Sequence, residues 1–190
     1  MMKAGHLEVN SSTKKEVIMA GTGGRGVLLA GEILLHAAAA EYEHVAYFPS
    51  YGTSMRGGHV ECTVILSNER IGSPLLPQAD VVVIFDNVKL SEFEGRVRPG
   101  GMLILESTGL TQEPARSDIK VTKIPAVEIA NTSGDIRTAN LILLGAYVAA
   151  TNAIAPALIE RRLEQQLVAK KQEKSLPANL AAFRRGLEIA

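Results

Sequence analysis

Two glycine-rich stretches contain the residues of this chain whose types and spacing could bind a ligand. The first, residues 21–26, reads Gly-Thr-Gly-Gly-Arg-Gly and lies between a short apolar stretch and an Ala/Leu-rich segment. This order of strand, turn and helix is typical of phosphate-binding loops, because glycines let the backbone approach a ligand and a helix start offers unpaired N–H groups. The loop can therefore hold a phosphate, and Arg25 within it is a candidate cation.

The second stretch, residues 50–58, places three glycines around Arg56. A guanidinium on such a backbone-exposing loop can clamp a phosphate or a carboxylate, whereas the plainer interpretation is a tight turn with a solvated arginine. Each stretch follows an expected strand, so both should lie at the carboxyl edge of a parallel sheet, where such folds bind ligands. This shared position puts the two interpretations of Arg56 on an equal footing.

The glycine spacing of the first loop also fits a dinucleotide-binding fingerprint, with Gly21, Gly23 and Gly26 in its three positions. A nicotinamide cofactor needs an acidic residue at the end of the second strand, whereas residues 49–51 read Pro-Ser-Tyr. A kinase-type P-loop is disfavoured because the Lys-Ser/Thr ending is missing. A self-sufficient Rossmann-like nucleotide-binding protein or NAD(P)-dependent dehydrogenase therefore stays only as the alternative function.

No other pattern in the chain indicates a catalytic or metal site. There is no Gly-x-Ser-x-Gly elbow, and the histidines lack the spacing of metal ligands. His36 has no partner at helical spacing, so we expect a partly buried structural histidine. Cys62 lies in the middle of an expected strand, where a cysteine behaves as a small buried hydrophobe. We therefore expect no catalytic residue and no metal ligand on this chain.

The composition is that of one α/β domain. The 190 residues include 20 basic and 20 acidic side chains, so no global field favours nucleic acid or a membrane. A single cysteine excludes an internal disulfide and a cysteine-held iron–sulfur cluster, and it fits a reducing compartment, most simply the cytoplasm. Residues 1–14 are polar, and we expect a disordered or cloning-derived lead before a single domain at 15–190.

The hydrophobic pattern predicts an α/β fold: a Rossmann-like domain whose mostly parallel sheet carries helices on both faces. We expect Asp86 and Asn87 to cap a short helix. The helix at 138–150 is almost wholly apolar, so part of it and of the first helix should lie at a subunit interface. The expected strands are 17–20, 44–48, 60–67, 81–85, 102–105 and 119–124. The expected helices are 27–40, a short one from 88, 126–130, 138–150, 156–174 and 176–187.

Taken together, the motifs resemble those of the gamma subunit of the 2-oxoacid:ferredoxin oxidoreductases, nearest the 2-oxoglutarate and 2-oxoisovalerate types. The likeness spans about residues 17–186, with Thr53 and Ser54 in place of the usual Pro-Glu pair of the second loop. The matching residues are Gly21–Gly26, Leu28–Gly31, Ser50–Gly52, Met55–Gly58, Cys62, Ser73–Pro74, Ala79–Asp80, Pro99–Gly101 and Asn140–Ala146.

This resemblance implies one subunit of an oligomer that oxidatively decarboxylates a 2-oxoacid such as 2-oxoglutarate or pyruvate. Such complexes use coenzyme A and reduce ferredoxin, while thiamine diphosphate, Mg and the iron–sulfur clusters belong to other subunits. The chain should therefore be inactive alone. By the same resemblance, a role in binding coenzyme A falls on Gly23, Gly24, Arg25 and Arg56.

Overall fold

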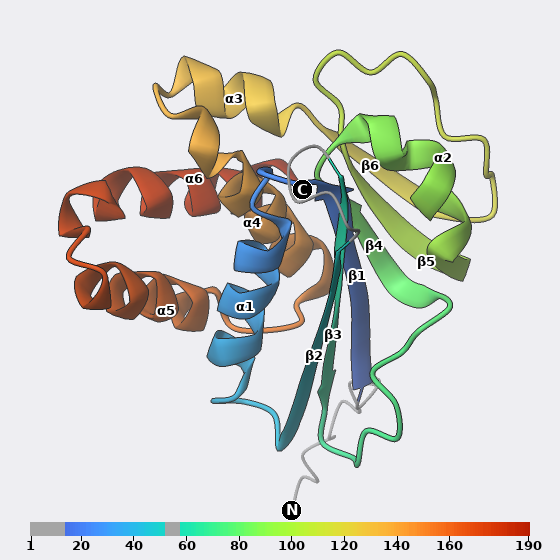
Figure 1. Cartoon of the computed structure of the whole chain (residues 1–190), viewed down its shortest axis with the longest axis horizontal. Helices are drawn as coiled ribbons and strands as arrows, with labels where there is room; N and C mark the ends of the chain where they lie inside the picture. Colours follow the sequence, from blue (N-terminus) through green and yellow to red (C-terminus); the bar gives the residue numbers. More distant parts are fainter. Residues whose placement is uncertain (1–13, 52–57) are drawn as a thin grey trace, which may run out of the picture.

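A six-stranded sheet organises the protein, whose computed structural model describes residues 14–51 and 58–190. The spatial order of the strands is β2-β3-β1-β4-β5-β6 (Figure 1). The strands are β1 (Lys14–Thr22), β2 (His44–Tyr51), β3 (His59–Ser67), β4 (Ala79–Ile84), β5 (Val97–Glu106) and β6 (Lys120–Ile124).

Only β3 runs against the other strands. It pairs antiparallel with both β2 and β1, whereas β1–β4, β4–β5 and β5–β6 are parallel pairs. A short connection joins β2 to β3, and neighbouring strands joined without a crossover must be antiparallel. The remaining strands all point the same way, so the prediction of a mostly parallel α/β sheet is confirmed.

Helices cover the two faces of the sheet unequally. One face packs against α1 (Val27–Ala38) and α4 (Ala139–Thr151), while α5 (Pro156–Ala169) packs on α1 and α6 (Leu176–Ile189) packs on α4. The other face carries a smaller apolar cluster, built mainly with Leu90 and Phe93 of α2 (Leu90–Phe93). The short α3 (Ala126–Thr132) follows β6. The 3-10 turns are η1 (Asn87–Lys89), η2 (Glu94–Arg96), η3 (Ile136–Thr138) and η4 (Glu173–Ser175).

Helix α4 is enclosed within the chain, so the expectation that it contributes an interface surface is wrong. All its residues from Asn140 to Val148 are buried. Helix α6 crosses it at close range, where a Cβ on Gly145 would overlap the carbonyl oxygen of Phe183 and one on Gly186 that of Ile142. Two glycines thus let the helix backbones touch, and α6 covers the apolar side that a partner was expected to cover.

Several element boundaries differ from the prediction, and the structure gives a physical reason for two of them. Strand β2 continues through Pro49, because it lies at the edge of the sheet, where a residue without an N–H group is tolerated. Helix α5 ends at Ala169 rather than near 174. Lys171 there adopts a positive φ of 55°, and the N–H of Gln172 donates back to the carbonyl of Leu167 at 2.8 Å.

The predicted lead, residues 1–14, lies outside the described residues except for Lys14, which begins β1. Within the described part of the chain, no helix is long and apolar enough to cross a membrane.

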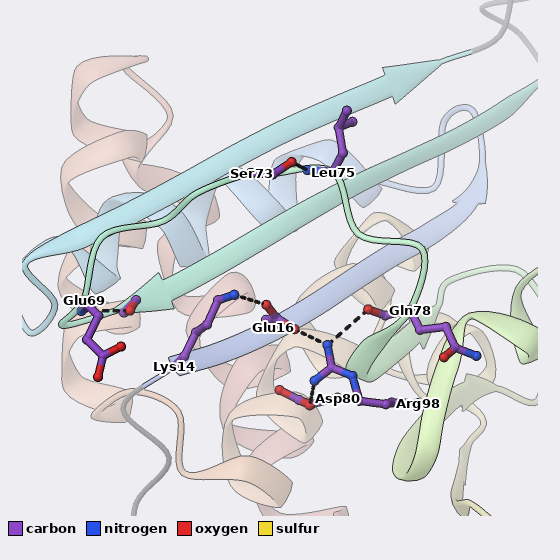
Figure 2. A network of polar contacts seen from close by, with 9 residues as sticks. Lys14, Glu16, Glu69, Ser73, Leu75, Gln78, Asp80 and Arg98 are labelled. Carbon is purple, nitrogen blue, oxygen red and sulfur yellow. Dashed lines mark hydrogen bonds and ion pairs between the residues drawn. The ribbon is translucent and has the colours of Figure 1, made fainter.

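A network of ion pairs closes the amino-terminal edge of the sheet (Figure 2). Glu16 of β1 is buried and pairs with both Lys14 and Arg98, and Arg98 also pairs with Asp80 and donates to the carbonyl of Gln78 at 3.4 Å. Burial alone would raise the pKa of Glu16, but the hydrogen bonds from Lys14 and Arg98 outweigh it and hold the pKa below 4.5. The network therefore ties β1, β4 and β5 together at one edge.

Candidate functional site

The two glycine-rich stretches meet at the carboxyl edge of the sheet. The N–H of Gly23, directly after β1, donates to the carbonyl of Gly58, directly before β3, at 3.0 Å. β1 and β2 both end at this edge. The prediction that the two stretches share an edge is therefore confirmed for the described ends of the second stretch, residues 50–51 and Gly58. Arg56 itself lies outside the described residues.

The first loop delivers the chain into α1 through a glycine at the capping position. Gly26 has a φ of 74°, which disfavours any residue with a Cβ, and it offers no side-chain acceptor to the first turn of α1. The first N–H groups of a helix have no partner within the helix, and the dipole makes this end positive. The start of α1 therefore presents backbone donors suited to an anion.

Asn140 of α4 fixes the position of this glycine from behind. Its amide Nδ2 donates to the carbonyl of Gly26 at 3.3 Å, and a Cβ on Gly26 would lie 2.6 Å from the same nitrogen. Asn140 is itself buried, so its side chain has little freedom to move away. The entry of α1 is therefore held by a contact between segments far apart in the sequence.

A pocket of about 560 Å³ opens over this loop. Gly23 and Gly24 line it, together with residues from the start of α1. The full lining comprises Thr22, Gly23, Gly24, Gly26, Val27, Leu28, Leu29 and Val60. Leu29 is 37% exposed, so the pocket combines backbone donors at one side with an apolar surface at the other.

Arg25 does not line this pocket. Its Nε lies 3.6 Å from the carboxylate Oδ2 of Asp86, which also accepts a short hydrogen bond from the hydroxyl of Thr22. The Arg25 side chain is 45% exposed, so its charge is partly neutralised but still accessible. Asp86 therefore belongs to the loop and does not cap the next turn, which corrects the prediction: it makes no side-chain hydrogen bond to η1.

Asn87 does not cap the short helix either. Its side-chain amide donates to the carbonyl of Thr108 at 2.8 Å, which ties the end of β4 to the segment after β5. Both polar residues after β4 thus connect neighbouring loops at the carboxyl edge.

The sheet order also bears on the nicotinamide alternative. In a dinucleotide-binding fold the strand beside β1 carries the acidic residue that binds the ribose. Here β3 lies between β1 and β2, and β3 begins at this edge with His59 rather than ending there with a carboxylate. This arrangement removes the position that a ribose-binding residue would need.

The predictions for the two remaining residues, Cys62 and His36, have different outcomes. Cys62 is buried as predicted, and burial, followed by the charges of Glu61 and Glu32, raises the pKa of its thiol to about 12. Such a thiol is unreactive at neutral pH. His36, in contrast, is exposed on α1 and not partly buried. No group of histidine, cysteine and acidic side chains able to hold a metal occurs in residues 14–51 and 58–190.

Two residues of the site, Asp86 and Asn140, were missed by sequence reasoning. Asp86 follows a buried parallel strand, and the carboxyl ends of such strands meet at one edge, so its position carried a usable signal. Asn140 carried one as well, as a polar residue inside an otherwise apolar helix, but only the packing of α4 against α1 identifies its partner.

The comparisons with known proteins agree with this geometry. The family model for pyruvate ferredoxin/flavodoxin oxidoreductases matches residues 16–189. The 2-oxoglutarate synthase subunit KorC of Methanocaldococcus jannaschii is 30% identical over 180 residues, covering 93% of this chain and 94% of that protein. The ketoisovalerate oxidoreductase subunit VorA of Methanothermobacter marburgensis is 41% identical over 133 residues, covering 70% of this chain. That alignment spans only 28% of VorA.

Solved structures show the same fold. The gamma subunit of a keto/oxoacid ferredoxin oxidoreductase from Geobacter sulfurreducens matches with a TM-score of 0.79 at 26% identity, covering 93% of this chain and 98% of that one. A 2-oxoglutarate:ferredoxin oxidoreductase from Magnetococcus marinus, with 2-oxoglutarate, coenzyme A and succinyl-CoA bound, matches with a TM-score of 0.85 at 24% identity. That match covers 95% of this chain and 31% of the other. The chain therefore belongs to the pyruvate ferredoxin/flavodoxin oxidoreductase family.

Proposed function

We propose that this chain is the gamma subunit of a 2-oxoacid:ferredoxin oxidoreductase and helps to bind coenzyme A. Relatives that it matches along nearly their whole length are subunits of 2-oxoglutarate and pyruvate synthases. The complex would decarboxylate a 2-oxoacid, transfer the acyl group to coenzyme A and pass the electrons to ferredoxin. The single cysteine fits a reducing compartment such as the cytoplasm.

The chemistry of decarboxylation and electron transfer is assigned to partner subunits. An iron–sulfur cluster held by cysteines needs several thiolates, whereas this chain has one cysteine and buries it with a raised pKa. The residues present do not fit such a cluster. We therefore assign thiamine diphosphate, Mg and the clusters to the partners, and to this chain a contribution to substrate binding.

One observation carries the role in coenzyme A binding: the start of α1 opens into the pocket at the joined glycine loops. The free N–H groups of that helix end, the backbone of Gly23 and Gly24 and the partly accessible charge of Arg25 are all suited to phosphate. Leu28 and Leu29 offer an apolar surface beside them. Coenzyme A carries phosphates next to less polar groups, so it matches this pairing better than a small neutral substrate does. Arg56 joins the proposal through the family resemblance of its loop.

The test uses the complex purified with its partner chains. Replacing Arg56 by Ala should weaken the apparent affinity for coenzyme A about 10- to 150-fold, the equivalent of one charge-assisted contact of about 1.5–3 kcal/mol. Decarboxylation of the 2-oxoacid before acyl transfer should change little. Arg70→Ala, which removes an exposed arginine from another loop, is the matched control.

Two results would contradict the proposal. Turnover of a 2-oxoacid by the pure chain with a dye acceptor would show that it is not an accessory subunit. Unchanged coenzyme A affinity together with impaired assembly in Arg56→Ala would show that the loop serves the interface instead.

A further inference from the structure

A second pocket, remote from the glycine loops, lies between α1 and α5. It measures about 200 Å³ and lies where the two helices pack side by side (Figure 1). Its polar lining residues are His36, Arg161, Arg162 and Gln165, while Ala37, Ala40 and Leu158 form its apolar part. None of the lining residues is acidic. The pocket therefore collects positive and neutral donors without a carboxylate to neutralise them.

Its arginines differ from most others in the described part of the chain. Arg25, Arg96, Arg98, Arg116, Arg137, Arg184 and Arg185 each form an ion pair with a carboxylate. Arg161 and Arg162 have no ion pair or hydrogen bond within residues 14–51 and 58–190. Two adjacent guanidinium groups that lack partners among the described residues are available to a ligand from outside the chain.

Arg162 supplies the strongest single observation. Its Nε is buried and has no hydrogen-bond acceptor among the described residues. A buried donor left unpaired costs free energy, so the side chain gains if it turns its Nε edge toward an acceptor in the adjoining pocket. That edge of a guanidinium is one of those that bind an oxyanion through two parallel hydrogen bonds.

We propose that this pocket is an oxyanion-binding site that takes a phosphate group. Two guanidinium groups and an imidazole reach it from two helices, so the donors approach from several directions. A tetrahedral phosphate offers acceptor oxygens in several directions, whereas a carboxylate offers only two oxygens in one plane. The site is separate from the glycine-loop pocket, with which it shares no lining residue, and it does not depend on the proposed function.

The spacing of the lining residues explains why the pocket forms between α1 and α5. On α5, Leu158, Arg161, Arg162 and Gln165 follow at intervals of three and four residues and so share one face. His36 and Ala40 are four residues apart on α1. The small side chains Ala37 and Ala40 leave the space into which the longer side chains of α5 can turn.

The proposal is tested on the full chain by titration with inorganic phosphate, followed by the NMR signals of the arginine Nε–H groups. The Arg162 Nε–H signal should shift saturably, and Arg161→Gln should weaken the apparent affinity by about tenfold or more. Sodium acetate and sodium chloride at matched ionic strength should give no saturable shift. Glycerol 3-phosphate as a second probe distinguishes a phosphate ester, if it binds more tightly, from the free ion.

Variants make the result specific to the pocket. Arg162→Lys keeps the charge but loses the planar fork, so it should lose most of the phosphate affinity. Arg70→Gln removes an exposed arginine on another part of the surface, and it should leave the affinity unchanged. A shift that does not saturate, that chloride or acetate reproduces, or that persists in Arg161→Gln and Arg162→Lys would overturn the proposal.

Discussion

The two ends of β1 meet opposite electrostatic environments. At the amino end, the buried carboxylate of Glu16 is paired with Lys14 and Arg98, and Arg98 is paired again with Asp80. At the carboxyl end, the glycine loop leaves the first N–H groups of α1 without a side-chain cap, and Asp86 balances Arg25. The charges at the amino edge pair with one another and join the strands. At the carboxyl edge, backbone donors stay available for a ligand.

Because of this difference, substitutions at the two edges should have different effects on stability and on ligand binding. Substitutions at the amino edge should change the free energy of unfolding with little effect on a ligand at the other edge. Substitutions in the glycine loop should affect both quantities, because the conformation that exposes the donors is the one that only glycine adopts without strain.

The largest expected effect is that of Gly26→Ala. Alanine there must adopt a φ of 74° and place its Cβ against the buried Asn140, so we expect a loss of about 2–4 kcal/mol in the free energy of unfolding. Gly24→Ala is the control, since its φ is also positive but its Cβ would meet nothing within 4 Å. It should cost only about 1 kcal/mol. Urea denaturation measures both, and equal losses would contradict a specific role of the Asn140 contact.

At the amino edge, Glu16→Gln should destabilise the protein by about 1–3 kcal/mol. The change removes the buried partner of two cations, but Arg98 and Lys14 are themselves nearly half exposed, so water offsets part of the loss. Glu113→Gln, which breaks the exposed pair with Lys123, should cost less than about 0.5 kcal/mol. If the two variants unfold at the same urea concentration, the Glu16 network does not tie the strands together.

The same network predicts a dependence on pH. Because the folded pKa of Glu16 is lowered, its contribution is fully present above its unfolded value near 4.5 and is lost as the pH falls through the folded pKa. The stability difference between the wild type and Glu16→Gln should therefore be constant from pH 7 to about pH 5 and shrink below it. Urea denaturation of both proteins across this range checks the sign, and a difference that grows on acidification would contradict it.

The smallest expected effect is that of Asp86→Asn at the carboxyl edge. Asp86→Asn removes the negative charge beside Arg25 and keeps a group that can hydrogen-bond to Thr22. If this edge binds an anion, the affinity of the assembled complex for coenzyme A should rise about two- to fivefold, as expected for one partly exposed charge. Asp118→Asn, which alters an exposed pair with Arg116 away from the loop, is the control. A lower affinity in Asp86→Asn would show that the carboxylate positions Arg25 and does not oppose the ligand.

Local patterns predicted most of the fold because they are short-range. The apolar run from residue 60 to 67 located β3, the apolar run of residues 141–149 located α4, and Pro156 marked the start of α5. Local patterns could not predict which element packs against each apolar face. The packing of Gly186 against Ile142 depends on two helices distant in sequence, so α4 was wrongly expected to need a partner.

For the site, the sequence predicted the positions of the loops but not the directions of their side chains. Glycine spacing identified the loop, and strand direction placed its neighbour, because both follow from the order of elements along the chain. The direction of an individual side chain did not follow. Arg25 turns toward Asp86, and His36 faces outward, because the packing of complete helices and strands decides these orientations. The four candidate binding residues therefore stay a prediction.

The burial of α4 beneath α6 has a consequence for synthesis of the protein. A ribosome produces α4 before α6, so the nascent chain carries an apolar helix whose cover has not yet been translated. Until α6 is made, the side of Leu141 to Val148 that α6 covers has no cover from this helix. The close glycine contact thus completes the core only when the last helix of the chain is in place.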